Sequence, residues 1–185
     1  SAMLPDGEYD GALVLNQQEL GPEETKRLRW LGISDLYFFS RGVMGFKDMV
    51  PRVHKPMCDF IQREDIRRKL LLAPRSHLKT TCGVSNVLRK VCKNPEDCTL
   101  MGFETQRNAN TKLSIIKQQI LNNALFRHLY AYIIPPNIND TTWSQEEILL
   151  PRKRLDAGEP TIRTIGVGGA VVSQHFNTLD FDDLI

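Results

Sequence analysis

The sequence predicts an α/β fold with a mainly parallel sheet flanked by helices, and three observations lead to this prediction. Short apolar runs alternate with helix-forming stretches through the second half of the chain. One such run, residues 69–73, passes through a short turn into Lys79-Thr80 at the start of a helix. Another, residues 179–181, ends in Asp182-Asp183. Strands that alternate with helices form mainly parallel sheets, and ligands bind such sheets beyond the carboxyl ends of the strands.

The first part of the chain is predicted to be helical after a polar arm that reaches to about Gln18. A helix begins at Gly21-Pro22-Glu23-Glu24, because proline suits a first helical turn and acidic groups favour its positive end. Two further helices are expected over residues 33–44 and 51–63. Their expected core-facing residues are Leu36, Phe38, Phe39 and Val43 in the former and Val53, Met57, Phe60 and Ile61 in the latter.

The second part is predicted to alternate between strands and helices. Apolar residues at helical spacing give one face to a long helix, residues 107–121, through Leu113, Ile116 and Ile120. Gly166, Gly168 and Gly169 indicate a turn before the last expected strand. The other expected helices cover residues 79–91 and 124–132, and the expected strands cover residues 69–73, 99–103, 147–150, 161–167 and 179–181.

Size and composition fit one globular domain. The chain has 185 residues, of which 41% are hydrophobic and 25% charged, and this length can bury a real core. A net charge of +2 does not by itself indicate a nucleic-acid binder. The four cysteines form no Cys-x-x-Cys pair and no zinc spacing, so we expect reduced and mostly buried thiols. No apolar run has the length of a membrane span.

The turn at residues 74–81 is the first candidate site. A turn that leads from a strand into Lys-Thr at a helix start can wrap phosphates with backbone N–H groups. Lys79 would then reach the β and γ phosphates, and the Thr80 hydroxyl would bind Mg²⁺. The pattern usually has glycine where this chain has Ala73 and Leu78, because glycine accepts a positive φ cheaply. Ser76 or His77 is expected to take such angles instead; an ordinary strand-to-helix turn is the alternative.

The acidic pair at the end of the last expected strand is the second candidate site. Asp182 is expected to hold Mg²⁺, and Asp183 to orient or activate the attacking water. Adjacent residues of a strand point to opposite faces, so the two carboxylates are not equivalent. The alternative is that Asp-Asp simply caps a turn.

The order of these motifs resembles the N-terminal ATPase domain of the large terminase subunit, the DNA-packaging motor of tailed bacteriophages. The resemblance is carried by Val53-His54-Lys55-Pro56-Met57-Cys58, Leu72-Ala73-Pro74-Arg75-Ser76-His77-Leu78-Lys79-Thr80-Thr81, Phe103-Glu104-Thr105, Trp143-Ser144-Gln145-Glu146-Glu147-Ile148, Gly166-Val167-Gly168-Gly169, His175-Phe176 and Phe181-Asp182-Asp183-Leu184. It implies a P-loop NTPase fold of the ASCE (RecA-like) type. Residues 1–45 would be an arm with helices, and residues 46–185 the N-terminal part of the ATPase domain, without the nuclease domain.

The resemblance also implies an activity, cofactors and partners. The activity is Mg²⁺-dependent ATP hydrolysis coupled to the translocation of double-stranded DNA into the prohead, in the cytoplasm of a bacterial host. The implied partners are the portal protein, the small terminase subunit and further copies of the chain in a ring. Arg75 matches an arginine that contacts the γ-phosphate, and His54 falls on the adenine side. The implied nucleotide-binding residues are His54, Arg75, Ser76, His77, Leu78, Lys79, Thr80 and Thr81.

Departures from the family pattern keep other functions open. Thr178 and Asp180 stand where relatives carry aliphatic residues, and Asp183 stands where many have Glu. The chain is expected to be truncated after the Walker B strand, so that the isolated fragment would be a weak ATPase. One alternative is a helicase-type ATPase, which shares the loop and the acidic strand end. The other is a non-catalytic NTPase-like docking module, which the missing glycines favour.

Overall fold

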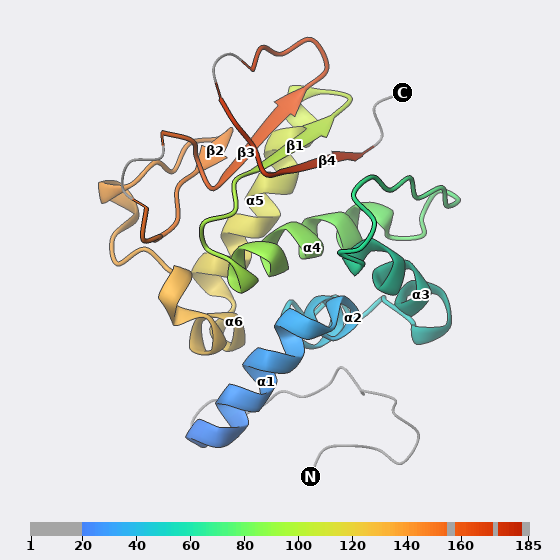
Figure 1. Cartoon of the computed structure of the whole chain (residues 1–185), viewed down its shortest axis with the longest axis vertical. Helices are drawn as coiled ribbons and strands as arrows, with labels where there is room; N and C mark the ends of the chain where they lie inside the picture. Colours follow the sequence, from blue (N-terminus) through green and yellow to red (C-terminus); the bar gives the residue numbers. More distant parts are fainter. Residues whose placement is uncertain (1–19, 155–157, 172–173, 183–185) are drawn as a thin grey trace. The chain divides into compact units, whose positions relative to one another are not determined.

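A computed structural model describes residues 20–154, 158–171 and 174–182 (Figure 1). The fold is α/β, with helices and a mixed four-stranded sheet. The chain divides into two compact units, each described below by itself. The first contains the chain up to Arg89 together with Asn123–Leu129, and the second contains Lys90–Asn122 and Tyr130–Ile185. None of the helices in the described ranges combines the length and apolarity needed to cross a membrane.

The first unit is helical. Its elements are α1 (Pro22–Ser34), α2 (Leu36–Phe38), the π-helix η2 (Phe39–Val43), α3 (Pro51–Gln62), the greater part of α4 (Lys79–Lys93) and α6 (Ala124–Leu129). The helices predicted over residues 33–44, 51–63 and 79–91 are therefore confirmed, as is the helix start at Pro22.

Capping and burial explain the first three helical elements. Pro22, Glu23 and Glu24 occupy the first turn of α1, as the sequence predicts. The Asp35 carboxylate then accepts a hydrogen bond from the backbone N–H of Phe38 (2.9 Å) and so caps α2. The four residues predicted to face the core from this segment, Leu36, Phe38, Phe39 and Val43, are all buried.

The core-facing side of α3 differs from the prediction. His54 and Cys58 are the buried residues of this helix, whereas the side chain of Val53 is 37% exposed. Met57 and Ile61 are partly buried against the same core. The buried face of α3 is shifted by one position from the predicted apolar stripe. A histidine and a thiol can both be buried, and a count of apolar letters does not register this.

The second unit holds the sheet. Its strands are β1 (Thr99–Phe103), β2 (Glu147–Ile148), β3 (Ile162–Gly166) and β4 (Thr178–Asp182), in the order β2-β3-β1-β4 (Figure 1). β1 pairs in parallel with β3 and with β4, and β2 is antiparallel to β3. The mainly parallel sheet predicted from the sequence is therefore confirmed. The other elements are α5 (Gln106–Asn122), η3 (Ala131–Ile133) and η4 (Ile138–Asp140).

β1 is one of the two inner strands, and all five of its residues are buried. Helix α5 packs on β1 and β3 and buries Ala109, Leu113, Ile116 and Ile120, which confirms its predicted apolar face. Gly166, the last residue of β3, meets the start of α5 so closely that a Cβ there would lie 2.3 Å from the backbone nitrogen of Gln106. Its N–H donates to the Gln106 side-chain oxygen (2.9 Å). This junction fixes where β3 ends.

The strand predicted over residues 69–73 is not formed. In the described part of the chain this segment belongs to no ladder, and the side chains of Leu70 and Leu72 are 76% and 82% exposed. Lys69 is held by a hydrogen bond from its ammonium to the Ile61 carbonyl (2.7 Å). An apolar run expresses a local preference for extended backbone, but a strand also requires a partner edge.

Replacement of Gly166 by alanine should lower the free energy of unfolding by about 1–3 kcal/mol, because the new methyl group would meet backbone atoms that cannot rotate away. Urea titration followed by circular dichroism measures this change. Gly158→Ala is the matched control, since nothing lies within 4 Å of a Cβ at that position. Equal stability of the two variants would contradict the close junction of β3 and α5.

Candidate functional site

The turn at residues 74–78 leads into α4 through an unusual backbone. Among described residues other than glycine, positive φ angles occur at Ser76 (65°) and Leu78 (50°). The sequence predicted such an angle for Ser76 or His77, and Ser76 has it. Leu78 also adopts it, although a leucine pays a steric cost there, which the sequence analysis took as an argument against that position. Helix α4 begins directly afterwards at Lys79, and the Cys82 N–H donates to the Leu78 carbonyl (3.0 Å).

Residues 76 and 78 are left-handed, and His77 between them is not. Alternation of left-handed residues with others is typical of the backbone nests that bind anions in many phosphate sites. It lies at the first turn of a 15-residue helix, whose N-terminus carries partial positive charge. The turn therefore combines two left-handed residues with a helix N-terminus, without the glycines that usually provide such angles.

The side chains of the turn differ in exposure. Arg75 and Ser76 are exposed, while His77, Leu78, Lys79, Thr80 and Thr81 are partly buried. The His77 ring nitrogen Nδ1 lies 3.0 Å from the Arg75 carbonyl oxygen, so the ring is tied to the turn itself. The Thr81 carbonyl accepts a hydrogen bond from the Ser85 hydroxyl (2.7 Å) inside α4. The cationic and hydroxyl groups expected to bind phosphates and Mg²⁺ thus follow the nest in direct succession.

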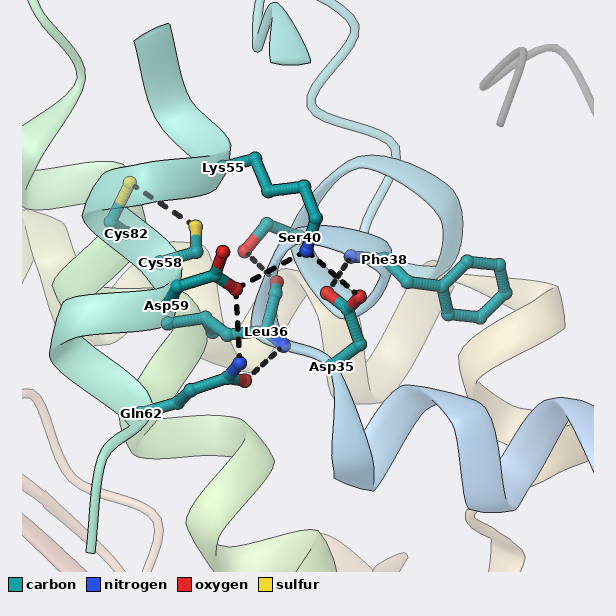
Figure 2. Close-up of polar contacts among 9 residues, drawn as sticks. All are labelled: Asp35, Leu36, Phe38, Ser40, Lys55, Cys58, Asp59, Gln62 and Cys82. Carbon is teal, nitrogen blue, oxygen red and sulfur yellow. Dashed lines mark hydrogen bonds and ion pairs between the residues drawn. The ribbon is translucent and has the colours of Figure 1, made fainter. Parts of the chain in front are cut away.

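His54, which the family resemblance places on the adenine side, and its neighbour Lys55 lie on α3 and both have structural partners. The His54 ring is 5% exposed, and its Nδ1 lies 2.8 Å from the Val50 nitrogen and 3.1 Å from the Val50 carbonyl oxygen. The Lys55 ammonium lies 3.2 Å from a carboxylate oxygen of Asp59 and 3.5 Å from one of Asp35 (Figure 2). Burial disfavours its charge, but the two carboxylates outweigh this effect and raise the pKa of Lys55.

The second candidate site is the end of β4. Asp182 is the last described residue of this strand and pairs with Phe103 of β1. Asp183, predicted to orient water, lies outside the described residues. Because side chains alternate along a strand, Asp182 shares its face with Asp180, whereas Leu179 and Phe181 occupy the other face and are 60% and 53% exposed. The carboxylates that share a face are therefore two residues apart.

Asp180 is strongly perturbed by its surroundings. Burial and the neighbouring Asp182 carboxylate raise the pKa of Asp180 to about 6, and the positive charge of Lys90 opposes both effects. Lys90, in the last turns of α4, also donates to the Thr178 hydroxyl (3.2 Å). That hydroxyl donates in turn to the Asp97 carboxylate (3.0 Å). Burial raises the pKa of Asp97, while the Thr178 hydrogen bond and Lys90 lower it.

Asp180, on β4, and Lys90, which contacts the first residue of that strand, were not assigned from the sequence. In the sequence, Asp180 was noted only because relatives of the family carry an aliphatic residue at that position. Period-two alternation was the available signal, since it places residues 180 and 182 on one face. Lys90 gave no local signal, because its proximity to β4 depends on tertiary folding.

The donor set at the end of β4 fits Mg²⁺ in chemical type. Mg²⁺ binds hard oxygen ligands, commonly one or two carboxylates completed by water and phosphate oxygens. Asp182, with Asp180 on the same face, offers such oxygens. Within the described residues, no group of three or more His, Cys, Asp or Glu side chains forms a metal cage.

Comparisons of the chain with protein-family models, with curated proteins and with solved structures give no match. The loop lies in the first unit and the acidic strand in the second. Each of the two candidate sites is therefore assessed by the chemistry of its own residues.

Replacement of Asp180 by asparagine should stabilise the protein at pH 7.5 by an amount on the order of 1–2 kcal/mol. A carboxyl group whose pKa is raised in the fold binds its proton more tightly when folded, so the parent should lose stability as the pH rises from about 4 to 6. The gain of Asp180→Asn should shrink at pH 4.5, where Asp180 is protonated. Urea titrations at both pH values measure it.

Asp48→Asn, at an exposed position, is the matched control and should show no such pH-dependent gain. If Asp180→Asn were equally destabilising at both pH values, the buried charge at position 180 would not be the cause.

Proposed function

We propose that this chain binds ATP through residues 74–81 and hydrolyses it with Mg²⁺, as the ATPase part of a large terminase subunit in a viral DNA-packaging motor. The single observation that carries the nucleotide site is the pair of left-handed, non-glycine residues Ser76 and Leu78 at the start of α4. Strained backbone of this kind costs free energy and is concentrated at functional sites. An ordinary strand-to-helix turn has no need of it.

Each residue of the loop has a role in this proposal. The backbone N–H groups of residues 76–79 surround the phosphates, and Lys79 neutralises the β and γ oxygens. The Thr80 hydroxyl holds Mg²⁺. Arg75 is exposed at the turn and stabilises the charge that develops on the γ-phosphate, as positioned arginines do in phosphoryl transfer. This last role rests on the resemblance to the terminase family.

The acidic strand end supplies the second half of the chemistry. Asp182 binds Mg²⁺, and Asp183 orients the water that attacks the γ-phosphorus in line with the departing ADP oxygen. Mg²⁺, when held by Asp182, would supply positive charge that neutralises the charge developing on the phosphate oxygens. Positioning and electrostatics thus provide most of the catalysis.

The biological setting rests on the resemblance alone. It comprises translocation of double-stranded DNA, a ring of identical subunits, and contact with the portal protein and the small terminase subunit. The exposed basic run Arg67-Arg68-Lys69, directly before the loop, is compatible with a polyanionic partner.

A non-catalytic docking module is the second candidate function. Leu70 and Leu72, two residues apart in an extended segment, expose apolar side chains next to the loop, and exposed apolar groups of this kind favour contact with another protein. This function requires no nucleotide affinity.

Lys79→Ala should weaken ATP binding by about 10- to 100-fold, because a charge-assisted contact to phosphate is lost. Isothermal titration calorimetry of the chain with ATP and Mg²⁺ measures the affinity. Lys47→Ala, an exposed lysine of the same unit, is the control and should bind as the parent does. No binding by the folded parent at millimolar ATP would reject the nucleotide site and favour the docking module.

A pair of substitutions at Ser76 separates backbone from side chain. Ser76→Gly keeps the left-handed angle available and should leave ATP affinity within about twofold of the parent. Ser76→Val places a β-branched residue at φ 65° and should weaken binding about tenfold. The same calorimetry decides. Equal loss in both variants would assign the role to the serine hydroxyl and not to the nest.

A further inference from the structure

Two cysteines of the first unit face each other in its core. Cys58 lies on α3 and Cys82 in the first turn of α4, and their sulfur atoms are 3.9 Å apart (Figure 2). Both side chains are fully buried and both thiols are reduced. A disulfide requires the sulfurs to approach to about 2.05 Å, so the pair is within about 2 Å of bonding distance.

The contact makes the two thiols unequal. The Cys58 thiol donates to the sulfur of Cys82. This hydrogen bond lowers the pKa of Cys82 against the opposing effect of burial. The same hydrogen bond, burial and the nearby carboxylates of Asp35 and Asp59 raise the pKa of Cys58. Cys82 also lies at the positive end of α4, where thiolates are favoured. Cys82 is therefore the thiol that ionises first.

The loop covers this pair. Cys58 and Cys82 belong to a core cluster with Leu36, Tyr37 and Met49, and the partly buried Leu78 packs against it. Leu78 does so from a left-handed backbone conformation, which is strained for a leucine. Leu78 therefore joins the strained turn to the packing around the two thiols.

We propose that Cys58 and Cys82 are the site of a reversible disulfide, formed by a hydroperoxide, that ties α3 to the first turn of α4. The Cys82 thiolate attacks the peroxide oxygen, which gives a sulfenic acid and releases hydroxide. The Cys58 thiol then attacks the sulfenic sulfur, forms the S–S bond and expels the oxygen as water. In total, two thiols and one H₂O₂ give one disulfide and two waters.

The disulfide would restrain the loop. It closes a segment of about 25 residues that contains the whole turn. Such a crosslink stabilises the folded state relative to the unfolded chain, and it holds α4 at the point where the turn joins it. The inference does not depend on nucleotide binding, because it is tested without nucleotide.

Peptide mapping tests the proposal directly. The full chain is treated with a small excess of H₂O₂, alkylated and digested without reductant. We expect a peptide pair linked through Cys58 and Cys82, an intact mass lower by about 2 Da, and reversal by dithiothreitol. The melting temperature of the oxidised form should rise by about 5–10 °C.

Variants and alternative products complete the test. Cys82→Ala should abolish the loss of about 2 Da, whereas Cys92→Ala should leave it intact. Leu78→Ala should speed oxidation several-fold, because it removes the cover. The proposal is overturned if the folded parent forms no disulfide while the urea-unfolded chain does. It is equally overturned if the linked peptides contain other cysteines, or if residues 58 and 82 proceed to sulfinic acid without crosslinking.

Discussion

The packing of Leu78 into the core of the first unit is the constraint on which the candidate loop depends. Its side chain lies against the cluster that contains Cys58 and Cys82, while its backbone stands at φ 50°. A left-handed leucine costs roughly 1–2 kcal/mol, and full burial of a leucine side chain contributes about 1.5–3 kcal/mol. Even partial burial of the Leu78 side chain can therefore stabilise the strained turn. The turn positions the backbone N–H groups that lie at the start of α4.

In the second unit, the candidate acidic site depends on the pairing of β4 with the buried strand β1. The register sets Asp180 opposite Met101 and Asp182 opposite Phe103. Both carboxylates therefore lie on one face of β4. Lys90 is near enough for its positive charge to lower the pKa of Asp180, against the effects that raise it. The apolar side chains Leu179 and Phe181 take the other face. A shift of one residue would exchange these two sets, so the acidic face depends directly on this ladder.

Much of the secondary structure could be predicted, because helices and short buried strands leave local signatures. The boundaries of β1, residues 99–103, and the buried face of α5 agree with the sequence analysis. Residues 69–73 have the same apolar signature as a strand but form none. On α3 the apolar stripe pointed to Val53, whereas His54 and Cys58 are buried. The first error arises because strand pairing depends on partners distant in the chain, and the second because a count of apolar letters does not register a buried histidine or thiol.

The sequence by itself determined the chemical groups and their local order: a turn that runs into Lys79 and Thr80 at a helix start, and a strand that ends in Asp182. These follow from periodicity and turn chemistry, which act over a few residues. Only the tertiary structure decided that Leu78 shares the left-handed backbone, that Lys90 comes near Asp180, and that Cys58 meets Cys82. Each of these depends on packing between segments that are separate in sequence, and no local pattern encodes such contacts.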